Sequence, residues 1–277
     1  MEYKRILTIQ DISCLGQCSM TVALPVLSAC GQETCILPSA ILSTHTGGFN
    51  APAIKNLTDL MPCVQNHWQQ EGISFDAIYT GYLGSIGHIT CVEDIFANML
   101  ASGGRIIVDP AMADHGKLYK GFDEAYVEAM VGLCKKADVV LPNLTEACML
   151  TGCEYKEVYD EDYITHVVGK LHEMGIPCVV LTGVGYNREE TGVLISVSEG
   201  IYTYHHPKIA RGYHGTGDLF AAAFVGGWIG GKSMTEAARI AADFVCESIR
   251  NTSCDSNHWY GVKFETALPY LLKRLYE

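Results

Sequence analysis

Several features that mark other classes of protein are missing from this chain of 277 residues. It has no C-x-x-C pair, so its 12 cysteines lack the spacing of a zinc finger. Its longest apolar run, Leu219–Gly231, is too short to cross a lipid bilayer. Positive charge is scarce too, because 19 lysines and arginines face 31 acidic residues, a net charge of −12. These absences argue against nucleic acid or a membrane as the main partner.

Polar linkers, low-complexity tracts and evident repeats are also lacking, so we expect one domain over residues 1–277. With 48% hydrophobic and 18% charged residues, the chain can bury a large core. The first residues are charged and lead into a candidate strand, so we expect no targeting segment and a cytoplasmic protein. Because the cytosol is reducing, we expect most cysteines to be free, buried thiols.

Short β-branched or apolar runs alternate with longer helical patterns. The candidate strands are Arg5–Ile9, Cys35–Leu42, Ala77–Tyr79, Arg105–Val108, Val139–Leu141, Cys178–Leu181, Gly192–Ser196 and Gly200–Tyr204. The candidate helices are Ser19–Ala29, Leu57–Gln70, Ile89–Ala101, Phe122–Lys135, Leu144–Leu150, Glu161–Met174, Gly217–Ile229, Ser233–Arg250 and Phe264–Leu275. Apolar strands of this kind are typical of a parallel sheet covered on both faces. We therefore expect an α/β fold, a three-layer α/β/α sandwich whose mostly parallel sheet has a β-hairpin at one edge.

Polar and glycine residues follow almost every candidate strand. They are Gln10-Asp11, Thr44-His45-Thr46, Thr80-Gly81-Tyr82, Asp109-Pro110, Pro142-Asn143 and Thr182-Gly183. Open α/β sheets bind ligands beyond the carboxyl ends of their strands. Turns alone do not require two aspartates, two threonines and a tyrosine at one edge of a sheet. The pattern therefore favours an active site there.

The most informative segment is His214–Ala223, a glycine-rich turn that leads through Asp218 into a small, apolar run. Glycines let backbone N–H groups approach an anion, and the N-terminus of the following helix would add its dipole. A carboxylate such as Asp218 suits this place if it removes a proton from a hydroxyl group that then attacks phosphorus. Alternatively, Thr216 or Asp218 caps the helix. The segment alone leaves both interpretations open.

Two further segments carry groups that suit Mg²⁺. Asn143 and Glu146 lie where a candidate helix begins, so they either cap it or hold hydrated Mg²⁺ on a nucleotide phosphate. Asp109 and Asp114 follow a strand, where they either belong to an ordinary turn or support a metal site, since two acids near phosphates are useful only with a cation between them. A metal site, an anion cradle and a general base together meet the requirements of phosphoryl transfer. The sequence has no Walker-type Gly-Lys-Ser/Thr loop and no protein-kinase motif set.

Four motifs, in their order and approximate spacing, resemble the pyridoxal kinases of the ribokinase-like superfamily of small-molecule kinases. They are Thr80-Gly81-Tyr82-Leu83-Gly84-Ser85, Asp109-Pro110-x-Met112-x-Asp114, Pro142-Asn143-x-Thr145-Glu146 and Gly215-Thr216-Gly217-Asp218. The Gly-x-Gly-Asp element is shared across the superfamily, whereas Gly-Tyr-Leu-Gly-Ser points to the vitamin B6 branch. The resemblance implies phosphorylation of the 5′-hydroxymethyl group of pyridoxal, pyridoxine or pyridoxamine by ATP.

The resemblance also implies roles for the matching residues. Asp218 would deprotonate the substrate hydroxyl, and the amides of Gly215, Thr216 and Gly217 would hold the phosphoryl group in transfer. Asp11, Thr46, Tyr82 and Tyr119 would bind the substrate. Asp109, Asn143, Glu146, Thr182 and Gly183 would bind ATP, with Asp109 and Glu146 serving Mg²⁺ through water. A monovalent cation is a further candidate cofactor, and a homodimer is expected from the family alone.

Asp11 departs from the family, because pyridoxal kinases usually have a serine at this position. An ionised carboxylate accepts hydrogen bonds or pairs with a protonated pyridine nitrogen, but it cannot donate. Sugar kinases of the superfamily often have aspartate here, although this chain has no room for their β-lid before a helix near Ser19. Hydroxymethylpyrimidine kinases usually have a Gly-Ser-Asp loop, where this chain has Gln10-Asp11-Ile12-Ser13.

Three alternatives to a vitamin B6 kinase therefore stay open. A sugar kinase and a hydroxymethylpyrimidine kinase share the expected fold and chemistry. The third alternative is a non-catalytic ligand-binding regulator with the same fold, since fold and motif do not prove function. Loss of the base or of the metal carboxylates would favour it, and the sequence retains both.

Overall fold

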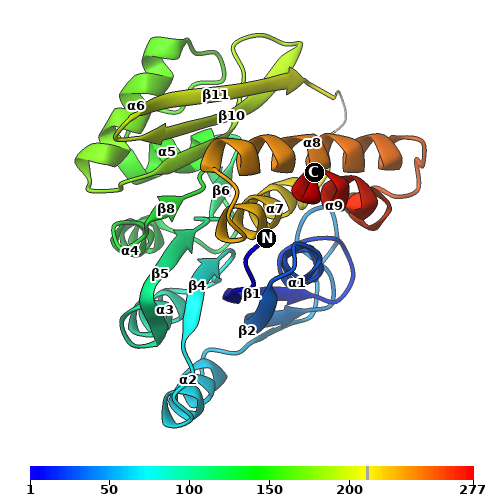
Figure 1. Ribbon diagram of the computed structural model, residues 1–277. Coiled ribbons are helices and arrows are strands. Elements are labelled where there is room, and N and C mark those ends of the chain that lie inside the picture. Colours follow the sequence, from blue (N-terminus) through cyan, green and yellow to red (C-terminus); the bar gives the residue numbers. More distant parts are fainter. Residues whose placement is uncertain (210–211) are drawn as a thin grey trace.

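A nine-stranded sheet forms the centre of the computed structural model, which describes residues 1–209 and 212–277 (Figure 1). Its strand order is β11-β10-β9-β8-β5-β4-β1-β2-β3. The strands are β1 Arg5–Ser13, β2 Glu33–Leu42, β3 Ile54–Asn56, β4 Phe75–Thr80, β5 Leu100–Val108, β8 Val139–Val140, β9 Val179–Val184, β10 Glu190–Val197 and β11 Gly200–Pro207. Neighbours from β2 to β9 pair in parallel, whereas β3, β10 and β11 pair antiparallel. A separate two-stranded sheet joins β6 Ala113–Asp114 to β7 Lys117–Leu118.

Helices cover both faces of the sheet and give the molecule three layers (Figure 1). One face is covered by α1 Met20–Ala29, α7 Thr216–Ile229, α8 Met234–Ser253, the 3-10 helix η1 Phe264–Ala267 and α9 Leu268–Tyr276. The other is covered by α2 Leu60–Gln70, α3 Ile86–Met99, α4 Glu124–Cys134, α5 Leu144–Thr151 and α6 Glu161–Glu173. Two apolar cores result, one on each side of the sheet.

The helices begin where the sequence offers capping groups. Ser85, Asp123, Asn143, Asp160 and Ser233 each accept a hydrogen bond from a backbone N–H group in the first turn of their helix. The helix α7 is buried from residue 219 to residue 227, because α1 and α8 pack against it in the layer beside the sheet. A helix buried on all sides is apolar all round, as its sequence is.

The expected α/β sandwich and its edge hairpin are confirmed. Three details differ. The first strand continues to Ser13, because Ile12 and Ser13 pair with β2 beyond a register shift, so Asp11 lies within a strand and not in a turn after one. The range 264–275, predicted as one helix, is η1 followed by α9, whose first turn contains Pro269. The short strands β3, β6 and β7 were not predicted, since two or three residues show no alternation.

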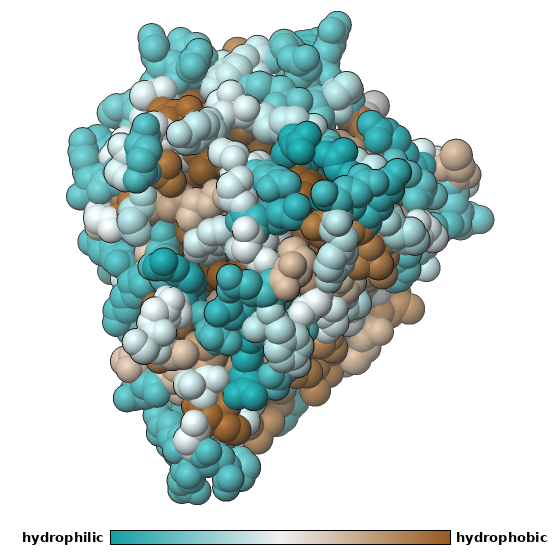
Figure 2. Space-filling model, viewed as in Figure 1, coloured by the Kyte–Doolittle hydropathy of each residue, from teal (hydrophilic) through white to brown (hydrophobic). Residues whose placement is uncertain are grey.

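The face of the molecule drawn in Figure 2 is mainly hydrophilic, in keeping with the acidic composition. No helix in the described ranges 1–209 and 212–277 is both long and apolar enough to cross a membrane. All 12 cysteines are free thiols, as expected, but only six are buried, and Cys35, Cys91 and Cys153 are partly buried. Cys14, Cys63 and Cys254 are exposed instead.

Candidate active site

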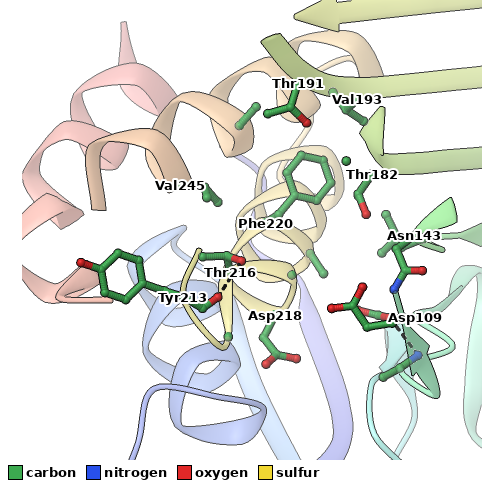
Figure 3. A pocket seen from close by; sticks show the side chains of 18 of the residues that line it. Asp109, Asn143, Thr182, Thr191, Val193, Tyr213, Thr216, Asp218, Phe220 and Val245 are labelled. Atoms are coloured by element: carbon green, nitrogen blue, oxygen red, sulfur yellow. Dashed lines mark hydrogen bonds between the residues drawn. The ribbon is translucent and has the colours of Figure 1, made fainter. Parts of the chain in front are cut away.

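A cavity of about 420 Å³ lies at the carboxyl ends of β8 and β9, beside the N-terminus of α7 (Figure 3). Its polar half is lined by Asp109, Asp114, Tyr119, Asn143, Glu146, Thr182, Gly183 and the segment Gly215–Asp218. Its apolar half is lined by Val193, Phe220, Ala242, Val245 and Ile249. The two halves place charged groups and an apolar surface in one continuous space.

Most of the residues singled out in the sequence meet in the polar half. Asp11, Thr46 and Tyr82, the predicted substrate residues besides Tyr119, are not part of its lining. Burial and, to a smaller extent, the charge of Asp11 raise the pKa values of Tyr82 and Asp218, so the carboxylate of Asp11 lies near both groups. Thr46 is exposed in the loop after β2. The cavity therefore brings together the predicted phosphate and metal residues, whereas Asp11, Thr46 and Tyr82 lie outside its lining.

The turn before α7 requires glycine. Gly215 has φ 78°, and a Cβ atom there would lie 1.8 Å from the carbonyl oxygen of Gln17. Gly215 is itself the N-cap residue, and no side chain caps the helix. The alternative that Thr216 or Asp218 serves as the cap is therefore wrong. The first N–H groups of a helix lack partners within it, so those of α7 are available to an anion in the polar half.

Asp218 lies in the first turn of α7, and its side chain lines the same cavity as that of Asp109 (Figure 3). Its Oδ2 accepts a hydrogen bond of 2.9 Å from the backbone N–H of Ser19. Burial, and the charge of Asp11, raise the pKa of Asp218 to about 6. Burial and the charges of Glu146 and Asp218 raise the pKa of Asp109 well above its ordinary value.

Asn143 and Glu146 form a capping box at the start of α5. Asn143 Oδ1 accepts from the N–H of Glu146 at 3.0 Å, and Glu146 Oε2 accepts from the N–H of Asn143 at 2.9 Å. Glu146 Oε1 also accepts from the N–H of Met112 at 3.0 Å. Burial raises the pKa of Glu146 to about 7, although these N–H groups favour its ionised form. The same two residues thus cap a helix and line the cavity.

The acidic polar half fits a hydrated cation. Among residues 1–209 and 212–277, no lysine or arginine lines the cavity. Within that part of the chain, no group of three or more His, Cys, Asp or Glu residues could hold a metal ion directly. Mg²⁺ commonly keeps several waters and takes one or two carboxylates besides phosphate oxygens. Asp109 and Glu146 fit this mode, because each is buried and carries a raised pKa that a nearby cation would lower.

The small sheet β6–β7 carries Tyr119 beside the polar half. The N–H of Gly116, at its turn, donates to Thr145 Oγ1 at 3.0 Å, and the N–H of Tyr119 donates to the carbonyl of Met112 at 2.8 Å. Thr145, which lies within a recognised motif, was a candidate cap of α5, but Asn143 is the N-cap residue and Thr145 holds Gly116 instead. The five apolar-half residues were missed, because apolar residues on α7, α8 and β10 have the same pattern as any core.

The fold and the cavity define a small-molecule kinase of the ribokinase-like class, which confirms the resemblance seen in the four motifs. Within that class, the chain belongs to the phosphomethylpyrimidine kinase family, whose sequence pattern matches residues 27–262.

Similar proteins carry two kinds of name. Hydroxymethylpyrimidine/phosphomethylpyrimidine kinase of Bacillus subtilis is 30% identical over 186 residues, and the match spans 66% of each chain, slightly less than two thirds. Pyridoxal kinase from Lactobacillus plantarum is 30% identical with a TM-score of 0.90, over 98% of this chain and 97% of that one. A Bacteroides thetaiotaomicron protein, provisionally named a phosphomethylpyrimidine kinase, is 33% identical with a TM-score of 0.92, over 97% and 95% of the two chains. The latter structure contains pyridoxal.

Proposed function

We propose that this protein transfers the γ-phosphoryl group of ATP to the 5′-hydroxymethyl group of pyridoxal, pyridoxine or pyridoxamine. The observation that carries the proposal is the position of Asp218. Its partly buried carboxylate lines the polar half of the cavity from the first turn of α7, beside backbone N–H groups suited to an anion. The attack of an alcohol on a phosphoryl group requires a base for the hydroxyl proton next to a site that binds the phosphoryl oxygens.

Asp218 acts as the general base in this proposal. With its pKa raised to about 6, it is largely ionised at neutral pH and is a better proton acceptor than an ordinary aspartate. It takes the proton of the substrate hydroxyl while the oxygen attacks the γ-phosphorus. The N–H groups of Gly215, Thr216 and Gly217 donate to the oxygens of the phosphoryl group in transfer.

The rest of the cavity accommodates the nucleotide. The apolar half, with Phe220 between Val193 and Val245, takes the base, and Thr182 and Gly183 border the phosphates. Asp109 and Glu146, with Asn143 also in the cavity lining, would hold hydrated Mg²⁺. Bound Mg²⁺ would neutralise charge on the phosphate oxygens. A monovalent cation is a further proposed cofactor, and activity in potassium and in tetramethylammonium salts would test it.

The substrate proposal rests on the relatives. The Lactobacillus plantarum relative is named a pyridoxal kinase, and the structure from Bacteroides thetaiotaomicron contains pyridoxal. Both cover nearly the whole chain. Hydroxymethylpyrimidine is the second candidate substrate, because the Bacillus subtilis relative is named for it and the matching family is that of phosphomethylpyrimidine kinase.

A direct assay separates these candidates. ADP release is measured with pyridoxal, pyridoxine, pyridoxamine, hydroxymethylpyrimidine and ribose, and ³¹P NMR identifies each product. We expect phosphorylation of at least one B6 vitamer at the 5′ position. If only hydroxymethylpyrimidine caused ATP consumption, it would take the place of the B6 vitamers as the proposed substrate. If no tested alcohol caused ATP consumption, a non-catalytic regulator would be favoured.

Asp11→Ser tests the departure from the pyridoxal kinases. The buried carboxylate of Asp11 accepts hydrogen bonds but cannot donate one when ionised, whereas serine does both. We expect the ratio of kcat/KM between vitamers to change by about tenfold or less, the value of one hydrogen bond. Unchanged ratios would show that Asp11 has no part in substrate choice.

We further propose that the chain acts as one domain, in a homodimer and in the cytoplasm. Light scattering measures the mass of the assembly in solution, and limited proteolysis reveals any separable domain.

A further inference from the structure

Ser19 has an unusual backbone conformation between β1 and α1. Its φ is 51° and its ψ −127°, in a region that favours glycine. Residues held in such conformations cluster at functional sites, where the surrounding structure fixes them. Ser19 is buried, and its backbone bridges to Ile12, the residue after Asp11.

The surrounding segments hold this turn in place. A Cβ atom on Gly16 would collide with the ring of His45, and one on Gly261 with Gln17. A Cβ on Gly215 would collide with the carbonyl of Gln17. Three separate loops therefore pack against the chain just before Ser19.

The hydroxyl of Ser19 does not perform its usual task. Serine is a favoured N-cap residue because its oxygen accepts from a backbone N–H in the first turn. Ser19 is the N-cap residue of α1, yet its side chain makes no capping hydrogen bond. Instead it lies close enough to the carboxylate of Asp11 to lower its pKa and favour its ionised form, while that carboxylate accepts a hydrogen bond of 3.0 Å from Ser13 Oγ.

The backbone of the same residue serves the second carboxylate. The N–H of Ser19 donates to Asp218 Oδ2 at 2.9 Å. One residue thus lies against both Asp11 and Asp218, through two different groups.

Within residues 1–209 and 212–277, the other titratable groups that act on Asp11 and Asp218 supply no positive charge. Asp11 faces Cys18, Tyr82 and His45, in addition to the two serines. His45 Nδ1 accepts from the N–H of Gly47 at 3.1 Å, so Nε2, 2.8 Å from the carbonyl of Tyr260, carries the proton and the ring is neutral. Asp218 faces Cys18, Tyr79, Tyr119, Asp109 and Asp11.

We propose that Ser19 is a positioning residue that orients Asp11 through its hydroxyl and Asp218 through its N–H, at the expense of a strained backbone. The inference rests on the proposed function, in which Asp218 is the base and Asp11 lies at the substrate end. It predicts that Ser19→Gly relieves the backbone strain and yet weakens substrate binding.

Ser19→Ala and Ser19→Gly form a matched pair, because both lack the hydroxyl but only glycine relieves the strain. We expect the KM for pyridoxal to rise about tenfold in both, since a hydrogen bond to a charged group is lost. The kcat should stay near that of the wild type, because the N–H remains. The Tm of the glycine variant should exceed that of the alanine variant by about 3 °C. Ala51→Gly, which relieves a φ of 45° in an exposed loop, is the control for strain alone.

A titration that needs no turnover separates this inference from the proposed function. With ¹³C-labelled aspartate carboxyls, assigned through Asp11→Asn, the pKa of Asp11 should be higher in both Ser19 variants than in the wild type. Substitution of Ser19 in the Asp11→Asn background should have little further effect on KM. The inference is overturned if the Asp11 titration is unchanged, if only the alanine variant raises KM, or if the two substitutions are additive. Failure of every vitamer as a substrate would overturn the proposed function and leave the titration result standing.

Discussion

The polar and apolar halves of the cavity are built in different ways. The polar half consists of strand ends and the start of α7, where hydrogen bonds such as that from Ser19 to Asp218 fix each group. The apolar half consists of side chains on α7, α8 and β10. Their positions follow from the packing of the core between the sheet and the helices α1, α7, α8 and α9. Groups fixed by hydrogen bonds can be aimed at reacting atoms, whereas a packed apolar surface recognises shape. We therefore expect substitutions in the polar half to affect turnover and those in the apolar half to affect nucleotide binding.

The largest effect is expected from Asp218→Asn. The amide cannot accept a proton from the substrate hydroxyl, so kcat should fall by about two to four orders of magnitude, the usual contribution of a general base. Isothermal titration with pyridoxal should show binding close to that of the wild type. Turnover near the wild-type value would remove Asp218 from the proposed mechanism.

Glu146→Gln tests the metal side of the polar half. The neutral amide attracts hydrated Mg²⁺ less, so the Mg²⁺ concentration for half-maximal activity should rise about 10- to 100-fold. Calorimetry without Mg²⁺ should give an ADP affinity similar to that of the wild type. Equal losses of ADP affinity with and without Mg²⁺ would show that the capping box, not the metal, is affected.

Val245→Trp tests the apolar half. An indole in this space competes with the nucleotide base, so the KM for ATP should rise about tenfold or more while the KM for pyridoxal changes little. Arg250→Trp, on the exposed side of the same helix, is the matched control. A rise in the KM for pyridoxal alone would place the substrate, not the base, in the apolar half.

The difference between the polar and apolar halves of the cavity also explains which site residues the sequence could predict. Carboxylates and glycines at strand ends, such as Asp109 and Gly215, are conspicuous because turns alone do not require them there. Val193 and Val245 carry no such mark, since an apolar residue lining a cavity and one filling a core occur in the same periodic pattern. The position of Asp11 within β1 depends on a shift in strand register, which the sequence does not reveal. The positive φ of Ser19 was hidden for a different reason, because serine next to a helix predicts an ordinary cap.

The smallest effect concerns stability and its dependence on pH. The folded state raises the pKa of Asp218 from 3.8 to about 6, so folding favours the protonated acid. Its contribution to stability is fully present below pH 4 and is lost as the pH rises through about 6. The cost of ionisation at pH 8 is about 3 kcal/mol, because each pKa unit corresponds to about 1.4 kcal/mol. Asp218→Asn should therefore raise the Tm by several degrees at pH 8 and change it little at pH 4. Val245→Leu, in the apolar half, should shift the Tm equally at both pH values, since it carries no charge. A Tm for Asp218→Asn below that of the wild type at pH 8 would show that the chain itself stabilises the ionised base.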